Sequence, residues 1–232
     1  MTNTLHQTTL FTSNDFAMPE HRGGDHWTIL HGDAMRIVPQ FERNVFDAVI
    51  TDPPYASGGA SQTAKNRSTT EKYSSLRGDK ALPDFDSDQM DQRSWTRWMC
   101  EWLQVVRAAC KPGAPICLFI DWRQLPSMTD ALQWAGWTWR GIAVWDKPSG
   151  RPQRGRFRQQ AEFIVWGSNG KMPLERNVGC LPGGRILDPF AGSGTTILAA
   201  VQEGYEAVGI ELTDAYFQLG TQRVKQVLES QK

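Results

Sequence analysis

The sequence predicts an α/β fold with a doubly wound, mostly parallel sheet and helices on both faces. Short apolar runs alternate with helical patterns from residue 27 to the C-terminal end. The stretch 185–228 has the pattern strand, glycine turn, helix, strand, helix, which requires a right-handed crossover between parallel strands. We find no repeat and no linker, so 25–232 is expected to form a single domain. The polar segment 1–24 is expected to be a flexible leader.

The first elements are delimited by polar residues and prolines. An apolar run predicts a strand over 27–32, and the segment 33–41 predicts a short helix with Asp33 near its start. The run 46–50 is apolar and β-branched, which favours a buried strand. Two prolines follow this strand and end it, because proline donates no hydrogen bond to a sheet. A polar cluster is therefore expected at the carboxyl end of a buried strand.

The middle of the chain has strands and helices in alternation. Tryptophans and valines at helical spacing predict a helix over 94–109, which Lys-Pro-Gly ends. A second buried strand is expected at 114–122, and a helix at 125–137 with a glycine stop. Two further strands, 138–148 and 161–167, are separated by an arginine-rich stretch.

The C-terminal part is the most regular. A strand over 185–190 leads into a glycine turn and a helix over 195–203, which Gly204 ends. A strand over 205–211 and a terminal helix over 214–228 complete the unit. Each parallel strand of such a unit carries its carboxyl end to the same edge of the sheet, where open α/β sheets bind their ligands.

Composition excludes several classes of protein. The chain has 232 residues, of which 40% are hydrophobic and 22% are charged, so a wholly disordered chain is excluded. No apolar run is long enough to span a membrane, and the N-terminus lacks a secretory signal, so we expect no membrane partner and a cytoplasmic location. The four cysteines have no metal-ligand spacing, and no metal is expected. The net charge of zero, taken alone, argues mildly against a nucleic-acid partner.

The glycine turn predicts a nucleoside site. Gly192 and Gly194 stand between a strand and the N-terminus of a helix, where backbone N–H groups are free to bind a ligand. Glu211 ends the next strand, where a carboxylate can accept both hydroxyls of a ribose. The third glycine of the dinucleotide pattern and the Gly-Lys-Ser/Thr of a P-loop are absent. A nucleoside without phosphates is therefore the favoured ligand; a tight turn with a surface glutamate is the alternative.

A second cluster, Asp52-Pro53-Pro54-Tyr55, follows the strand 46–50. The Asp52 carboxylate and the Pro53 carbonyl can both accept hydrogen bonds from one amino group, and Tyr55 can stack on the ring that carries it. The alternative is an Asp-Pro turn with a packing tyrosine. Together with the glycine turn, the cluster favours a site for a planar amine.

The two motifs, DPPY at 52–55 and DPFAGSGTT at 188–196, resemble those of the amino-group DNA methyltransferases that use S-adenosylmethionine. Their order, with the catalytic motif first, is similar to the permuted β group of that family. LHGDAMRIV before DPPY and VGIELTDAYFQLGTQRV near the end are similar to the family's flanking segments. The resemblance implies a Rossmann-like methyltransferase fold and S-adenosylmethionine as cofactor. DPPY, in place of a serine before the prolines, points to N6 of adenine.

The resemblance also assigns roles to residues. Asp52, Pro53, Pro54 and Tyr55 would hold the target base, flipped out of double-stranded DNA, beside the methyl donor. The methyl group would pass directly to the amine, without a covalent enzyme intermediate. The residues expected to bind the cofactor are Asp33, Ala34, Asp188, Phe190, Gly192, Gly194, Thr195, Thr196, Glu211 and Leu212.

Basic residues provide candidate DNA contacts, because a run of cations can follow a phosphate backbone. The positions of the basic residues are therefore a better guide to DNA binding than the net charge of the whole chain. One group lies between the strands 138–148 and 161–167, and a second lies in the Ser/Thr/Gly-rich segment 56–80, which we expect to be a mobile loop. A solvated or disordered loop is the alternative for both. The candidates are Lys147, Arg151, Arg154, Arg156, Arg158, Lys65 and Arg67.

The sequence departs from the family at 167–184. This stretch has no room for the usual target-recognition region or for the helix that closes the cofactor pocket. A reduced or missing recognition region implies weak cofactor binding, or a pocket wall supplied by a second subunit in a homodimer; omission of residues from the chain near 180 is the other explanation. Alternative functions are methylation of cytosine N4, of RNA or of a protein glutamine, and a catalytically weak DNA-binding module that retains the fold. A prokaryotic or phage origin is expected.

Overall fold

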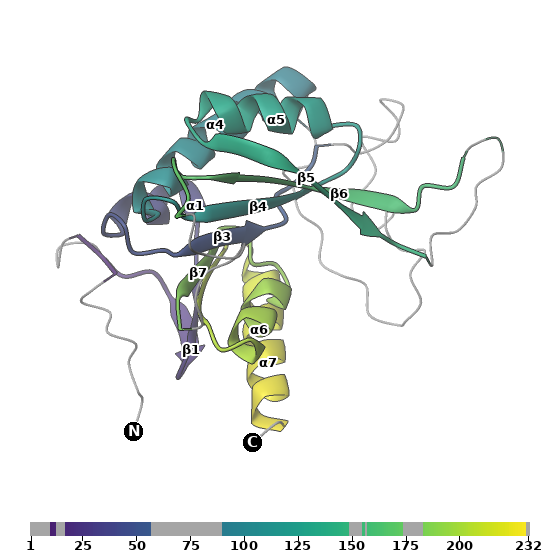
Figure 1. Cartoon of the computed structure of the whole chain (residues 1–232). Helices are drawn as coiled ribbons and strands as arrows, with labels where there is room; N and C mark the ends of the chain where they lie inside the picture. Colours follow the sequence, from purple (N-terminus) through teal and green to yellow (C-terminus); the bar gives the residue numbers. More distant parts are fainter. Residues whose placement is uncertain are drawn as a thin grey trace.

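The fold is an eight-stranded sheet with helices on both faces (Figure 1). A computed structural model describes residues 10–12, 17–56, 90–148, 155, 157–173 and 183–230. The strand order is β1-β2-β8-β7-β3-β4-β6-β5. The five strands from β2 to β4 are mutually parallel, whereas β1, β6 and β5 pair antiparallel. The strands are β1 His21–Gly24, β2 Trp27–His31, β3 Ala48–Thr51, β4 Pro115–Ile120, β5 Thr138–Asp146, β6 Ala161–Ser168, β7 Arg185–Asp188 and β8 Glu206–Glu211.

The helices form two layers, and the sheet lies between them (Figure 1). The helix α4 (Gln92–Ala109) and α5 (Leu125–Trp134) pack on one face, together with α1 (Ala34–Ile37) and the 3₁₀ helix η2 (Val38–Gln40). The other face is covered by α6 (Thr195–Gln202) and α7 (Asp214–Ser230). Each layer buries its own apolar cluster against the sheet, so the predicted doubly wound α/β fold is confirmed.

The parallel strands place both motifs at one edge. The strands β2, β8, β7, β3 and β4 run in the same direction, so their carboxyl ends share that edge. The Asp-Pro-Pro-Tyr loop follows β3, and the glycine turn follows β7, the strand next to it. Beyond β4, the antiparallel strands β5 and β6 form a ribbon that projects from the body of the protein (Figure 1). The edge predicted to bind ligands is thus assembled from neighbouring strands.

The structure corrects several predicted boundaries. The last four residues of the predicted leader form β1, which pairs with β2 through a tight turn. The helix predicted over 33–41 is divided into α1 and η2, because Pro39 has no N–H with which to continue the α-helical pattern. The strand predicted to reach residue 190 ends at Asp188. The predicted loop beyond Ala56 lies outside the described residues.

Among the described residues, no helix is long and apolar enough to cross a membrane. Within the same part of the chain, no three His, Cys, Asp or Glu side chains are grouped so that they could hold a metal ion.

Candidate functional site

The loop after β3 is held in place by a buried tryptophan. Trp95, on α4, is 0% exposed, and its indole Nε1 donates a hydrogen bond to the Pro54 carbonyl at 2.7 Å. Pro53 is buried, whereas Asp52 is exposed at the sheet edge. Two prolines restrict the backbone, and the tryptophan fixes one of its carbonyls. The Asp52 carboxylate is therefore presented on a rigid support.

Tyr55 and Asp52 form one polar unit, in which the Tyr55 hydroxyl donates a hydrogen bond to Asp52 Oδ1. Desolvation by the surrounding protein raises the pKa of Asp52, and the Glu162 carboxylate adds to this effect; the Tyr55 hydrogen bond and Lys147 oppose it. Desolvation, with the Asp52 charge next, raises the pKa of Tyr55 well above its usual value, so Tyr55 keeps its proton. The unit offers a strong acceptor for an amino group.

The glycine turn after β7 combines close packing with an open position. Gly194, the N-cap of α6, has φ 77°, and a Cβ there would lie 2.7 Å from Val224 Cγ2 on α7. Gly192 has φ 50°, but a Cβ there would have the Phe190 carbonyl, at 3.9 Å, as its nearest neighbour within 4 Å. Gly194 thus allows the turn to pack on α7, whereas Gly192 leaves the backbone accessible to a ligand.

Glu211 connects the end of β8 to the glycine turn. Its carboxylate accepts hydrogen bonds from the Gly192 N–H at 2.9 Å and from the N–H and hydroxyl of Thr213 at 2.9 and 2.7 Å. Leu212, the next residue, is 58% exposed and provides an apolar surface beside this carboxylate. After the neighbouring strand β2, Asp33 is the N-cap of α1, and the next residue, Ala34, is buried. The structure therefore brings the predicted ribose and adenine contacts to adjacent strand ends.

Asp188 joins the two motifs. It is buried, and its Oδ1 accepts hydrogen bonds from the Thr51 hydroxyl at 2.6 Å and the Phe190 N–H at 3.1 Å. Burial raises the pKa of Asp188 to about 6, against the opposing effect of hydrogen bonds from Thr51, Thr196 and Phe190. Because Thr51 directly precedes Asp52, this bond couples the Asp-Pro-Pro-Tyr loop to the glycine turn. The Phe190 ring packs on two tryptophans of α4, Trp98 and Trp102.

Sequence reasoning missed several supporting residues. Arg223, on α7, donates hydrogen bonds from Nη1 to the Ser193 carbonyl at 2.9 Å and to the Thr195 hydroxyl at 2.8 Å. It therefore holds the glycine turn from behind. Trp95 and Thr51 were also missed as supports of the loop. The helical spacing of Trp95 indicated burial, but no sequence signal identified its hydrogen-bond partner.

The predicted DNA contacts are only partly visible. Lys147, just after β5, forms an ion pair with Glu162 of β6. The Arg158 guanidinium donates a hydrogen bond to the Pro148 carbonyl, at the outer end of the same ribbon. The other predicted contacts lie outside the described residues; they are Arg151, Arg154, Arg156, Lys65 and Arg67.

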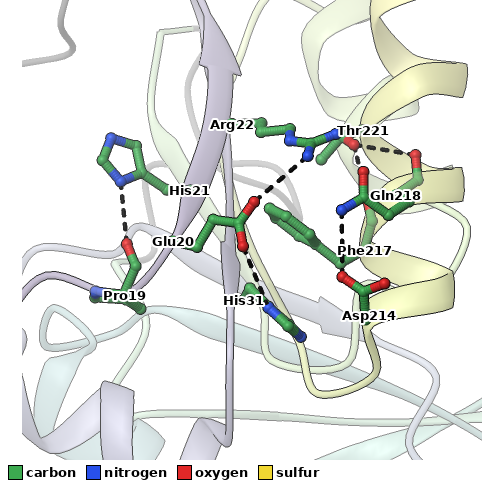
Figure 2. A network of polar contacts seen from close by, with 9 residues as sticks. All are labelled: Pro19, Glu20, His21, Arg22, His31, Asp214, Phe217, Gln218 and Thr221. Atoms are coloured by element: carbon green, nitrogen blue, oxygen red, sulfur yellow. Dashed lines mark hydrogen bonds and ion pairs between the residues drawn. The ribbon is translucent and has the colours of Figure 1, made fainter.

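A separate network of polar and aromatic contacts joins β1, β2 and α7 (Figure 2). His31 stacks on Phe217 of α7 with ring centroids 4.9 Å apart, and the Arg22 guanidinium lies 5.2 Å from the centre of the same ring. Glu20 forms ion pairs with Arg22 at 3.4 Å and with His31 at 3.8 Å (Figure 2). These contacts stabilise the packing of β1 on β2 and α7. The cavity next to this network, of about 700 Å³, is lined by the β1–β2 turn and α7, away from Asp52.

Comparison with known proteins agrees with this geometry. YubD of Escherichia coli (strain K12), named as a methylase, is 26% identical over 227 residues, covering 85% of this chain and 90% of the relative. The Type II methyltransferase M.SmaI of Serratia marcescens is 26% identical over 267 residues, covering 84% and 90%. The crystal structure of the M1.HpyAVI–SAM complex superposes with a TM-score of 0.61 at 22% identity, covering 85% of this chain and 98% of the other, and shows the same fold.

The family comparison covers both motifs. The model of the DNA methylase family, of the N6/N4 type, matches residues 46–178 and 174–222. These ranges extend from the strand before Asp52 to beyond Glu211 and take in well over half of the sequence. The chain therefore belongs to the DNA methylase family.

Proposed function

We propose that this protein transfers a methyl group from S-adenosylmethionine to the exocyclic N6 of adenine in double-stranded DNA. The observation that carries the proposal is the pairing of two sites at one sheet edge: an acceptor loop at Asp52 and a nucleoside cradle at Gly192 and Glu211. The Thr51–Asp188 hydrogen bond, 2.6 Å long, connects them. Membership of the DNA methylase family supports methyl transfer to DNA, and the SAM complex of the structural relative M1.HpyAVI supports the cofactor.

Two features of the cradle support S-adenosylmethionine as its ligand. The space at Gly192 allows close approach to the backbone at the N-terminus of α6, and the Glu211 carboxylate, which binds the Gly192 N–H, would accept the ribose hydroxyls. The exposed Leu212 would contact the adenine of the cofactor beside Asp33 and Ala34, and Asp188, Phe190, Gly194, Thr195 and Thr196 would surround its methionine end. When bound, the cofactor supplies an electrophilic methyl group on a sulfonium.

The Asp52 loop would prepare the amine for attack. The nitrogen of an exocyclic amine is a weak nucleophile because its lone pair is delocalised into the ring. Hydrogen bonds from the amine to the Asp52 carboxylate and the Pro53 carbonyl favour a pyramidal nitrogen, whose lone pair is available. The protonated Tyr55 holds the Asp52 carboxylate through its hydroxyl and stacks on the base. Positioning and fixed acceptors would supply most of the rate.

Adenine N6 is favoured over cytosine N4 by the aspartate before the prolines. The family includes both specificities, so the nature of the target base is part of the proposal. A base within a duplex cannot reach Asp52, and we therefore infer that it is flipped out. The basic group around Lys147 and Arg158, together with the basic residues of 56–80, would contact the phosphates.

A reduced recognition region is a further part of the proposal. The stretch aligned with M.SmaI is 267 residues long and exceeds the 232 residues of the entire chain. This relative therefore has segments without a counterpart here, and we infer that the shortening lies near 167–184, where the sequence departs from the family. A second subunit would complete the cofactor pocket, and light scattering of the purified protein at increasing concentration tests for that homodimer.

Methyl transfer from labelled S-adenosylmethionine to duplex DNA, followed by nucleoside analysis, tests the function. The expected product is N6-methyladenine. The variant Asp52→Ala should abolish transfer and retain cofactor binding, whereas Asp130→Ala, on the exposed surface of α5, serves as the control. Label in N4-methylcytosine would replace the adenine assignment. Full activity of Asp52→Ala would refute the mechanism.

A further inference from the structure

Two exposed tryptophans lie at the sheet edge, on the side of the Asp52 loop away from the glycine turn. Trp122 follows β4 and is 54% exposed; Trp145 belongs to β5 and is 47% exposed. The Trp145 ring packs edge-on against Phe119 of β4, with centroids 5.9 Å apart. Since β4 is the neighbour of β3, both rings lie on the strands that continue the edge outward from Asp52.

A cation lies beside each ring, and a carboxylate pairs with that cation. The Arg123 guanidinium lies 5.6 Å from the centre of the Trp122 ring and forms an ion pair with Asp121 at 3.3 Å. The Lys147 ammonium lies 4.5 Å from the centre of the Trp145 ring and forms an ion pair with Glu162. We call these groups the Trp122 triad (Asp121, Trp122, Arg123) and the Trp145 triad (Trp145, Lys147, Glu162). The carboxylate in each triad keeps the cation beside its ring.

Both triads lie within electrostatic reach of the catalytic loop. After desolvation and Asp52, the carboxylates Glu162 and Asp121 are the further groups that raise the pKa of Tyr55. Lys147 and Glu162 also act on Asp52, with opposite signs. The rings are thus close to the position at which the target base would meet Asp52, and not on a remote face.

The chemistry of the triads suits a nucleotide whose base is unpaired. An exposed indole offers a stacking surface for any base, and the cation beside it can contact a phosphate of the same strand. Within each triad the charges balance, so stacking should contribute more than phosphate neutralisation. A double helix keeps its bases stacked on one another, whereas base flipping unpairs the target and disturbs its neighbours.

We infer that the two triads form a platform that binds the nucleotides next to the flipped target, with their bases stacked on Trp122 and Trp145. This inference rests on the proposed function, since the target is placed at Asp52. The rings act through binding and orientation of the strand, so they are positioning residues and not catalytic ones.

The test measures the affinity for a fluorescent single strand of about 20 nucleotides, with mixed sequence, and for its duplex. Trp122→Ala and Trp145→Ala are compared with Trp134→Ala, which removes a ring that is 67% exposed at the far end of α5. We expect each of the first two variants to lose about 10-fold in affinity for the single strand, at low and at high salt. Trp134→Ala should stay within about 2-fold of the wild type. Trp122→Phe and Trp145→Phe, which keep a ring, should retain most of the affinity.

The outcomes separate this inference from the proposed function. Equal affinities for all three alanine variants, or a loss confined to one of the two triads, would overturn the platform. Loss of affinity in the phenylalanine variants as well would also overturn it, because stacking tolerates the change of ring. If the wild type binds DNA through both rings but transfers no methyl group, the proposed function fails while the platform stands. Cofactor affinity should be unchanged in every variant.

Discussion

Trp95 provides the sharpest test of how the fold supports the catalytic loop. Trp95→Phe keeps an aromatic ring in the core but removes the indole N–H that donates to the Pro54 carbonyl at 2.7 Å. Trp137→Phe is a matched control, because its indole N–H donates to the Leu103 carbonyl at 3.0 Å and its side chain is also buried. Trp95→Phe leaves the Pro54 carbonyl without this donor, whereas the Leu103 carbonyl lies inside α4 and keeps its helical N–H partner. Only the first carbonyl belongs to the loop that carries Asp52.

The magnitudes follow from these contacts. Loss of a buried hydrogen bond that leaves its acceptor unsatisfied costs about 1–3 kcal/mol, so Trp95→Phe should lose about this much stability in urea unfolding; Trp137→Phe, whose acceptor keeps a helical partner, should lose about 0.5–1.5 kcal/mol. In the Trp95 variant the freed carbonyl can turn, which displaces the acceptors at Asp52 and Pro53. A displacement of about 1 Å can reduce the rate by about 100-fold. We therefore expect kcat to fall by about 10- to 100-fold in Trp95→Phe and by less than about 2-fold in Trp137→Phe.

The assay separates positioning from folding. Methyl transfer is measured at saturating DNA and cofactor, below the temperature at which either variant unfolds, and cofactor affinity is measured by titration calorimetry. The expected pattern is a reduced kcat with unchanged cofactor affinity in the Trp95 variant alone. If both variants lose kcat equally, or if neither does, the hydrogen bond to Pro54 does not position the loop.

Three further predictions concern the cofactor side. Burial raises the pKa of Asp188 to about 6 from 3.8, so the protonated form favours folding, and this stabilisation is present below about pH 4 and lost as the pH rises through 6. In urea unfolding, the stability of the wild type relative to Asp188→Asn should fall by about 2 kcal/mol between pH 4 and 7; a constant difference would contradict it. Gly194→Ala should chiefly lower the melting temperature, because its Cβ would lie 2.7 Å from Val224. Gly192→Ala should chiefly weaken cofactor binding. Calorimetry of both variants measures the two effects, and the reverse pattern would count against a cofactor site at Gly192. Arg223→Ala should lower cofactor affinity by about 10-fold, since its three hydrogen bonds to Ser193 and Thr195 are lost, and equal losses in the exposed Lys225→Ala on the same helix would show that the contacts do not matter.

The sequence by itself determined the order of the elements and the position of the motifs. Prolines after 46–50 and Pro189 after 185–188 end their strands through local backbone chemistry, which needs no knowledge of distant residues. The placement of Asp33 as a helix cap is equally local. Parallel strands bring their carboxyl ends to one edge of the sheet. The alternation of strands and helices was therefore sufficient to place Asp52 and Glu211 at the same edge.

The tertiary structure alone decided which side chains support those motifs. Thr51 and Asp188 are 137 positions apart, and Trp95 lies 41 positions from Pro54. Arg223 reaches the glycine turn only because α7 packs across it, and β1 joins the sheet only because β2 is available as a partner. Such contacts depend on how helices pack on a particular sheet, and periodicity identifies the buried face of a helix without identifying the atoms that its polar groups meet. Local rules therefore placed the candidate site residues, whereas long-range packing fixed their orientation.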